Sequence, residues 1–393
     1  VRYDKTEAYR NTRSTFGNDY NVADSIWYMI HKPITKDMLS GLTQMAVNND
    51  AYYAINNNTA TVGLRNFHNH VKRSLINMVN DKPNNNILLD LAVGKAGDLH
   101  KWIDAKLSFV MGIDIAGDNI NNKANGACAR YVNTRQQKRH GRMPSVIFLK
   151  GDTSKNIKDG RAFDQDKYKK MADGVFGNIS REEAKSIGPG LQLVWGKGKS
   201  GFDIVSCQFA LHYYFKDTEL CGEFLKNVAE CTKIGGHFIG TCFDGELIYN
   251  ALRDKDKLTV VIDERKVWEV EKDYGDIEWK DDVSSLGLGI NVYQASFAKT
   301  FKEYLVHFGF LEKLMIKYGF RKVAIESFKE FNDGNAKYRM SEKVKMISDF
   351  NKYFVFEKVR EVDRNINKFV FTEEDVPLST FIKYKKVILS KKV

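Results

Sequence analysis

The sequence predicts an α/β fold in which a parallel sheet is covered by helices on both faces. Short, almost fully apolar segments recur between residues 86 and 243, and helical segments separate several of them. Strands that are buried on both faces of a sheet read as such continuous apolar runs. After residue 243 these runs give way to alternating segments, which predict a strand-rich insertion or lid at about 244–320.

The predicted elements follow one another in a regular order from the first clear helix onward. That helix, at 64–79, carries apolar residues at helical spacing along one face. The predicted strands of the sheet are 86–93, 108–116, 145–152, 202–209 and 235–243. The predicted helices between them are 96–104, 121–138 and 218–231. In sheets of this kind a ligand lies beyond the carboxyl ends of the strands.

The region after the sheet is predicted from weaker patterns. Residues 259–274 alternate like one half-exposed strand, and 289–297 are predicted to pair with it. The remaining predicted elements are a helix over 300–320, a strand at 322–328 and a last strand near 384–392. Residues 155–200 and 332–375 are polar and give no clear signal.

Composition limits the class of protein and its partners. The chain of 393 residues has a formal net charge of +11, which favours a polyanionic partner, nucleic acid ahead of a membrane surface. No window is apolar enough to span a bilayer, and the first residues lack a signal-peptide pattern. The five cysteines form no C-x-x-C pair, which suits a reducing compartment and argues against a structural zinc site. The absence of an initial methionine suggests a piece of a longer protein.

A loop of small residues follows the first predicted strand, in "LLDLAVGKAGDLHKW" at 88–102. Ala92, Gly94 and Gly97 keep the spacing of G-x-G-x-x-G with the first glycine replaced. Such a loop lets the backbone approach a nucleotide cofactor, but small residues there also serve tight packing alone. The loop by itself leaves three possibilities open: a nicotinamide dinucleotide, a sulfonium cofactor, or no ligand.

Carboxylates also stand at the ends of the predicted strands. Asp114 is placed to accept both ribose hydroxyls of an adenosine, although an aspartate there also suits a helix N-cap. Asp152 ends the third strand, where a carboxylate or its neighbours can contact the adenine amino group. Together with Asp90 at the end of the first strand, they favour an adenosine-containing cofactor. They do not separate NAD from S-adenosylmethionine.

The fourth predicted strand runs directly into planar side chains, in "FDIVSCQFALHYYF" at 202–215. Aromatic faces stack on a nucleobase while amide and imidazole groups meet its edge, so this run favours a purine substrate over hydride transfer. The alternative is that the aromatic residues simply form core at the end of the sheet. Gln208, Phe209, His212 and Tyr213 together favour the substrate-binding interpretation.

Several of these segments together resemble the eukaryotic and viral mRNA cap guanine-N7 methyltransferases. "LRNFHNHVKRSLI" is similar to the family's R-N-F-N-N-W-hydrophobic-K helix, and the loop at 88–102 to L-D-L-G-C-G-K-G-G-D-L-x-K-W. "DIVSCQFALHYYF" resembles S-C-Q-F-x-x-H-Y-x-F, and "TFKEYLVHF" resembles P-E-[YF]-L-V-x-F. The resemblance implies a class I S-adenosylmethionine-dependent methyltransferase, which has a Rossmann-like central sheet with helices on both faces, here with a strand-rich lid insertion.

The resemblance also implies roles for individual residues. At positions that contact S-adenosylmethionine stand Lys72, Ala92, Gly94, Asp98, Asp114, Asp152 and Gln208. Around the cap guanine stand Asn69, Phe209, His212, Tyr213, Glu303 and Tyr384. Near the cap phosphates stand Lys95 and Arg130. Glu303, His212 and Tyr213 would serve catalysis by positioning the guanine, without acid-base chemistry, and the reaction needs no metal.

The chain departs from the family pattern at several positions. His68 and His70 replace the family's first Asn and its Trp, and Ala92, Val93 and Ala96 replace Gly, Cys and Gly. A methyl group at 92 is tolerated if the backbone φ is negative and strained if φ is positive. We therefore expect a slightly reshaped cofactor site. The alternative function is a degenerate methyltransferase fold that binds capped RNA, or activates a partner, without catalysis.

The implied substrate is 5′-capped mRNA, and the implied setting follows from the start of the chain. Residues 1–30 are expected to be a tail or linker from an upstream guanylyltransferase-like domain, as in capping enzymes of large DNA viruses, and 31–393 the methyltransferase domain. We further expect fusion to guanylyltransferase and triphosphatase parts, and a stimulatory subunit. We expect no membrane partner. A viral protein would act in the cytoplasm, in a viral factory or virion, and a cellular one in the nucleus.

Overall fold

The structure, a computed structural model, describes residues 61–137, 142–295, 299–333, 338 and 340–362. The expectations for residues 1–30, for Tyr384 and for a strand near 384–392 lie outside these ranges. The first helix described is α4 (Val62–Val79), where the sequence predicts one. Its buried residues recur at helical spacing and include Phe67, Val71 and Leu75.

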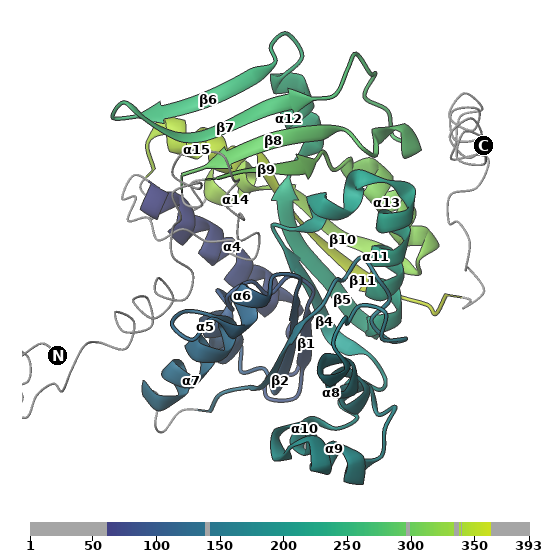
Figure 1. The fold of residues 1–393 in the computed structure, drawn as a ribbon. Helices are drawn as coiled ribbons and strands as arrows, with labels where there is room; N and C mark the ends of the chain where they lie inside the picture. The colour runs from purple at the N-terminus through teal and green to yellow at the C-terminus, as the bar shows by residue number, and fades with distance from the viewer. Residues whose placement is uncertain (1–60, 138–141, 296–298, 334–337, 339, 363–393) are drawn as a thin grey trace, which may run out of the picture. The chain divides into compact units, whose positions relative to one another are not determined.

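A seven-stranded sheet forms the centre of the described fold (Figure 1). Its strands are β1 (Ile87–Asp90), β2 (Phe109–Asp114), β3 (Ser145–Lys150), β4 (Phe202–Gln208), β5 (Thr232–Phe243), β10 (Phe320–Ser327) and β11 (Asn351–Lys358). They lie in the order β10-β11-β5-β4-β1-β2-β3, with β1 to β5 parallel and β11 antiparallel to both neighbours. The predicted parallel sheet is confirmed, and its first five strands are those expected from the sequence.

Strand β11 lies in the segment 332–375, which gave no clear signal in the sequence. The side chains of 353–356 are buried, and the strand pairs with β5 on one side and β10 on the other. An apolar run of four residues is too short to identify a buried strand by periodicity. The two neighbouring strands, which satisfy its backbone hydrogen bonds, make this segment a core strand.

Helices cover both faces of the sheet because successive strand residues point to opposite sides. Leu89 and Met111 pack with one set of helices, whereas Leu88 and Val110 pack with the other. The first set is α8 (Asp166–Phe176), α9 (Arg181–Ile187), α10 (Pro189–Val194), α11 (Thr218–Cys231) and α13 (Phe308–Lys317). The second set is α4, α5 (Leu99–Asp104), α6 (Gly117–Asn121), α7 (Ala127–Gln137) and α14 (Phe328–Asp333). This three-layer α/β arrangement is the predicted fold class.

A second, antiparallel sheet lies within the region predicted to be a strand-rich insertion (Figure 1). Its strands, in spatial order, are β6 (Lys257–Ile262), β7 (Arg265–Asp273), β8 (Gly289–Gln294) and β9 (Lys299–Tyr304). Residues of α12 (Gly245–Ala251) and α15 (Glu342–Asp349) pack with its buried side chains, which include Trp268 and Ile290. The second sheet therefore has an apolar core of its own.

Two predictions in this region were wrong. Residues 259–274 form a hairpin rather than one strand, because the chain reverses at Asp263 and Glu264, whose φ angles are 48° and 61°. Residues 300–304, predicted as the start of a helix, belong to β9 and pair with β8. The helix α13 starts only after His307, whose Nδ1 accepts the Phe310 N–H at 3.2 Å. The strand pairing and this cap set the boundary.

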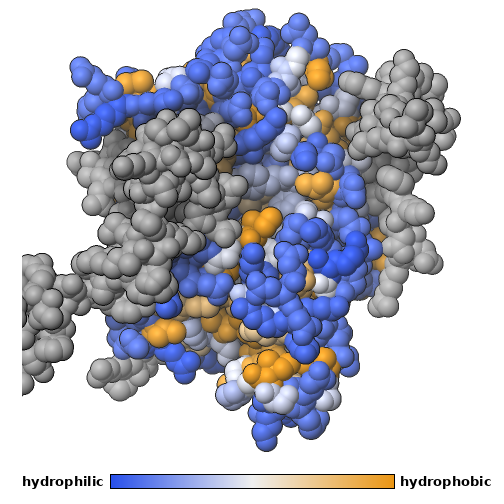
Figure 2. All heavy atoms as spheres, viewed as in Figure 1, coloured by the Kyte–Doolittle hydropathy of each residue, from blue (hydrophilic) through white to orange (hydrophobic). Residues whose placement is uncertain are grey.

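The segment 155–200, which also gave no clear signal, contains α8, α9 and α10. Figure 2 shows a mostly hydrophilic surface with apolar side chains gathered over α9 and α10. The exposed apolar side chains there are Ile187, Leu193 and Trp195. Among the described helices, none combines the length and the hydropathy needed to cross a membrane.

Candidate active site

The carboxyl ends of the parallel strands meet where the strand order reverses, since β1 lies between β2 and β4. Loops leave such a switch point in opposite directions and leave room for a ligand. The structure brings most of the sequence-predicted residues to this edge. The loop 92–98 follows β1, Asp114 ends β2, Asp152 follows β3 and Gln208 ends β4.

Hydrogen bonds to strand-end carboxylates fix the loop after β1. The Ala92 N–H donates to Asp90 Oδ1 at 3.1 Å, and the Gly94 N–H donates to Asp114 Oδ2 at 2.7 Å. Gly94 has a φ of 53°, which glycine adopts without a steric penalty. Ala92 keeps a negative φ, so the methyl group at this position is tolerated. The alanine in the left-handed region is Ala96, with a φ of 53°, and the strain of the altered loop falls there.

Asp114 organises this loop through several contacts. Its Oδ1 accepts the Ala116 N–H at 2.9 Å and an Asn119 Nδ2 hydrogen at 2.9 Å, in addition to the Gly94 bond at Oδ2. A carboxylate has about four acceptor positions, so roughly one remains for a ligand hydroxyl. Burial raises the pKa of Asp114, and these hydrogen bonds oppose the rise by stabilising the carboxylate. The side chain is thus a structural part of the loop as well as an acceptor.

A largely buried ionic network joins helix α4 to the same loop. Asp98 Oδ1 accepts from Lys72 Nζ at 2.6 Å and from Lys101 Nζ at 2.8 Å. Burial acts to raise the pKa of Asp98, but the two ammonium groups outweigh it and lower the pKa to about 2. Lys101 Nζ also donates to Asn69 Oδ1 at 2.8 Å. Two predicted cofactor contacts and one predicted guanine contact therefore belong to one network.

Lys101 was not singled out from the sequence, although it connects that network. Burial lowers its pKa, while the charge of Asp98 acts in the opposite direction. The sequence feature that could have identified Lys101 is its position three residues after Asp98, at the start of α5. Side chains at this spacing on a helix lie next to each other. That spacing is common on helices, so it becomes informative only once both side chains are known to be buried.

Asp152 and Gln208 lie further along the sheet edge. Asp152 Oδ1 accepts from the Ser154 N–H at 3.0 Å and from its hydroxyl at 2.6 Å, so the carboxylate shapes its own turn. Gln208 Oε1 accepts from Thr241 Oγ1 at 3.0 Å, and its Nε2 donates to Ser206 Oγ at 3.1 Å. These contacts hold the amide of Gln208 in one orientation at the end of β4.

Phe209 occupies a strained backbone position directly after β4. Its φ of 54° lies in the left-handed region, which bulky residues rarely adopt. Strained backbone positions of this kind cluster at functional sites. The Phe209 N–H donates to the Thr241 carbonyl at 2.8 Å, which holds the strained turn. Its ring stacks on His68, with centroids 5.2 Å apart and planes 22° apart. The departure from the family pattern at 68 therefore places an imidazole against this phenylalanine.

Two buried polar side chains face each other between the two sheets. His212, on the 3-10 helix η2 (Leu211–Lys216), and Glu303, on β9, are each 5% exposed. His212 Nε2 lies 3.6 Å from Glu303 Oε2, and neither ring nitrogen nor this oxygen has a hydrogen-bond partner among the described residues. Burial lowers the pKa of His212 to about 3 and raises that of Glu303 to about 8. Both groups are therefore mainly neutral at pH 7 and form no ion pair.

Unpartnered buried polar atoms are costly, and a bound ligand is one way to satisfy them. Tyr213 packs edge-to-face on His212, with ring centroids 4.2 Å apart. Tyr214 and Phe215 instead belong to the core, where Tyr214 stacks on Phe224 with centroids 3.8 Å apart. The core interpretation of the aromatic run thus holds for its last two residues. Phe209 and Tyr213 are only partly buried against the core, and His212 has ring nitrogens without a partner in the described part of the chain, so these three side chains are the candidates for contact with a planar ligand.

The two residues expected near the cap phosphates differ in their contacts. Lys95 is 8% exposed, and its Nζ donates to Asn125 Oδ1 at 2.7 Å and lies 3.4 Å from Asp118 Oδ2. Arg130 is exposed on α7. A phosphate that reached Lys95 would share its ammonium group with these two partners. The described residues contain no group of three or more His, Cys, Asp or Glu side chains that could hold a metal ion.

The strand order, the fixed loop after β1 and the acid at the end of β2 define a methyltransferase fold of class I. The chain matches the model of the mRNA (guanine-N(7))-methyltransferase domain over residues 45–368, and it belongs to this family.

Relatives of the chain carry related descriptions. A probable mRNA-capping enzyme of Acanthamoeba polyphaga mimivirus is 30% identical over 352 residues, which cover 80% of this chain and 27% of the viral protein. The mRNA cap guanine-N(7) methyltransferase of Caenorhabditis elegans is 34% identical over 196 residues, 49% of this chain and 41% of that protein. The chain therefore spans well under two thirds of the length of these relatives.

Solved structures that match this chain include an S-adenosylmethionine-dependent methyltransferase from Clostridium acetobutylicum. It is 14% identical with a TM-score of 0.39, and the match covers 86% of this chain and 99% of that one.

Proposed function

We propose that this chain transfers a methyl group from S-adenosylmethionine to N7 of the terminal guanine of 5′-capped mRNA, which converts GpppN to m7GpppN. Family membership supports the reaction. The observation that carries the proposal is the pair of buried, unpartnered polar groups on His212 and Glu303, which stand beside the carboxyl ends of the strands. Such a pair matches the hydrogen-bonding edge of a purine.

The loop after β1 fits the adenosyl cofactor. The left-handed Gly94 and the small side chains around it allow a ligand to approach the backbone, and Asp114 retains an acceptor position for a ribose hydroxyl. Lys72 and Asp98 fix the loop to α4, and Gln208 presents a held amide. When bound, S-adenosylmethionine supplies an electrophilic methyl group on a positively charged sulfur.

Glu303 is proposed to bind the Watson–Crick edge of the guanine. Its carboxylate accepts from the N1–H and the exocyclic amino group, and this stabilises the positive charge that methylation adds to the base. His212 offers a ring nitrogen to the same ligand, while Tyr213 and Phe209 provide aromatic faces. Asn69, on α4, accepts a hydrogen bond from Lys101 and so belongs to the ionic network that includes Asp98.

No general base is required, because N7 of guanine carries a free lone pair at neutral pH. The residues of the chain act by orientation: they hold the acceptor nitrogen in line with the methyl donor and exclude alternative poses. Such positioning contributes roughly 7–11 kcal/mol to lowering the barrier of a two-reactant step. His212 and Glu303 therefore serve as positioning and electrostatic groups.

The proposal is tested by radiolabel transfer from S-adenosylmethionine to GpppA-capped RNA. We expect Glu303→Gln to lower kcat on the order of 100-fold, since one side chain that stabilises developing charge is removed. Glu278→Gln is the matched control, because Glu278 is an exposed glutamate that pairs only with Lys280 among the described residues. Full kcat of Glu303→Gln at saturating cap would contradict the mechanism, and no transfer by the wild-type chain would contradict the function.

The alternative function, a non-catalytic module, was suggested by the alanine residues in the loop after β1. Ala92 has a negative φ and the Gly94 N–H still bonds to Asp114, so the loop gives little support to that alternative. We also propose that the chain is part of a capping enzyme with upstream guanylyltransferase and triphosphatase parts. The mimivirus relative, described as a probable mRNA-capping enzyme and much longer than this chain, supports a larger capping protein. Action in the cytoplasm, if the protein is viral, and a stimulatory subunit belong to the same proposal. The test is co-purification of cap-forming activity with the full-length protein.

A further inference from the structure

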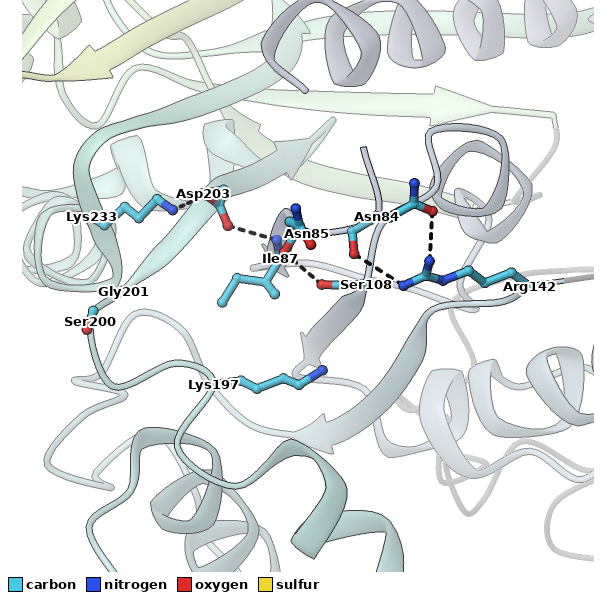
Figure 3. Close-up of a pocket in the computed structure, with 10 residues that line it drawn as sticks. All are labelled: Asn84, Asn85, Ile87, Ser108, Arg142, Lys197, Ser200, Gly201, Asp203 and Lys233. Carbon is cyan, nitrogen blue, oxygen red and sulfur yellow. Dashed lines mark hydrogen bonds and ion pairs between the residues drawn. The ribbon is translucent and has the colours of Figure 1, made fainter. Parts of the chain in front are cut away.

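A cavity opens at the opposite edge of the main sheet, at the amino-terminal ends of the strands (Figure 3). Its volume is about 480 Å³, and it is a polar depression that is open to solvent. Its lining comes from the starts of β1, β4 and β5 and from the loops before β2, β3 and β4. The seven residues of β4, at about 3.3 Å each, separate it from the proposed active site by roughly 20 Å. The cavity is therefore a separate place on the molecule.

Hydrogen bonds within the protein hold one wall of the cavity. Asp203 Oδ2 accepts the Ile87 N–H at 2.9 Å, and Asp203 Oδ1 forms an ion pair with Lys233. Ser108 Oγ donates to the Asn85 carbonyl at 2.8 Å. Lys233 and Asp203 therefore neutralise each other, and this wall contributes no net charge.

Two further cations, Arg142 and Lys197, line the cavity and have no carboxylate partner among the described residues. Arg142 donates from Nη1 to Asn84 Oδ1 at 3.0 Å and from Nη2 to the Asn84 carbonyl at 3.3 Å, both neutral oxygens. Lys197 extends across the cavity toward Arg142 (Figure 3). Its Nζ lies 5.6 Å from the centre of the Phe109 ring. Neither forms an ion pair with a carboxylate of the described residues. Both side chains are exposed. Partial desolvation, and then the charge of Arg142, lower the pKa of Lys197, and the two cations repel each other.

We propose that this cavity binds a phosphate group, held between the Arg142 guanidinium and the Lys197 ammonium. A phosphate relieves the repulsion between the two cations and offers the guanidinium a bidentate partner. The phosphate has two possible sources: the RNA chain downstream of the cap, or a free phosphorylated molecule. In the first case the inference rests on the proposed function. The GpppA cap dinucleotide has no such downstream chain to span the 20 Å or so between the two sites.

The test compares Arg142→Gln/Lys197→Gln with the control Arg253→Gln/Lys199→Gln. Arg253 is an exposed arginine that also donates to an asparagine, and Lys199 is an exposed lysine two residues beyond Lys197. The probes are a GpppA-capped RNA of about 25 nucleotides, followed by fluorescence anisotropy, and GpppA and inorganic pyrophosphate, each followed by calorimetry. We expect the cavity variant to bind the long RNA roughly 5- to 10-fold more weakly, with a salt slope smaller by about 1.4, for two lost contacts to a single strand.

Methyl transfer to GpppA should be unchanged in both variants. Weaker pyrophosphate binding with unchanged RNA binding assigns the cavity to a free phosphorylated molecule. Unchanged binding of the long RNA and of pyrophosphate overturns the inference. If the double variant does not fold, the single variant Lys197→Gln replaces it. This substitution removes no hydrogen bond between described residues. Because these measurements need no catalysis, they stand even if the wild-type chain fails to methylate GpppA.

Discussion

At the scale of single residues, burial decides the chemistry of the proposed active site. Glu303 and His212 lie 3.6 Å apart and would form an ion pair at the surface, yet burial keeps both mainly neutral. The sequence pointed to both residues through a family motif. It gave no sign of their protonation, because the burial of Glu303 on β9 depends on packing against η2, which is distant in the sequence. Lys101 was not predicted as a site residue because its burial, too, depends on tertiary packing, here of α4 against α5.

The raised pKa of Glu303 predicts a pH-dependent affinity for the cap. In the empty protein the carboxyl holds its proton below its pKa of about 8, and it must lose that proton to accept two hydrogen bonds from guanine. The Kd for GpppA should therefore fall as the pH rises from 6 to 8, by a factor on the order of ten or more. His212, with a pKa of about 3, does not titrate in this range.

Calorimetry of GpppA binding across this pH range checks the prediction. Glu303→Gln serves as the comparison, because the amide does not titrate and its affinity should be independent of pH. A wild-type Kd that stays constant, or that rises with pH, would show that the guanine is not held by the ionised carboxyl.

At the scale of secondary-structure elements, pairing and capping decided what local patterns left open. The hairpin β6–β7, the strand β9 and the core strand β11 each required a partner strand that periodicity does not reveal. The buried end of α11 is a further case. Lys358, at the end of β11 and 2% exposed, donates from Nζ to the carbonyls of Ala229 and Thr232 at 2.8 Å each. A strand residue thus caps a helix 126 or more positions away in the sequence.

We expect Lys358→Met to destabilise the fold by about 1.5–3 kcal/mol, because two buried carbonyls lose a charged donor while the apolar stem is kept. Urea unfolding followed by circular dichroism measures the change. Lys322→Met on the neighbouring strand β10 is the control, since Lys322 is exposed and pairs with Glu312, and it should cost less than about 1 kcal/mol. Equal losses in the two variants would mean that Lys358 acts as an ordinary surface cation.

At the scale of the whole molecule, ligand binding should report which cofactor the sheet edge accepts. A ligand that binds only the folded chain stabilises it, by about 2.7 kcal/mol at 100 times its Kd. We expect S-adenosylmethionine to raise the Tm by a few °C under these conditions. NAD, which the loop after β1 alone does not exclude, should leave the Tm unchanged.

Thermal unfolding with each compound makes the comparison, and Asp98→Asn provides the control. That substitution weakens the network of Lys72 and Lys101 that fixes the loop to α4, so it should reduce the shift caused by S-adenosylmethionine. A Tm that responds to NAD instead would contradict the proposed cofactor.

The sequence by itself determined the parallel sheet, the positions of its first five strands along the chain, and the strand-end positions of Asp114 and Gln208. Apolar runs and strand-to-loop transitions are local properties, so they are legible without the fold. The tertiary structure alone decided that the strain falls on Ala96, that Lys95 is already partnered, and that Arg142 and Lys197 face one cavity. Backbone φ, burial and the meeting of distant cations depend on which segments pack together, and no local pattern encodes that.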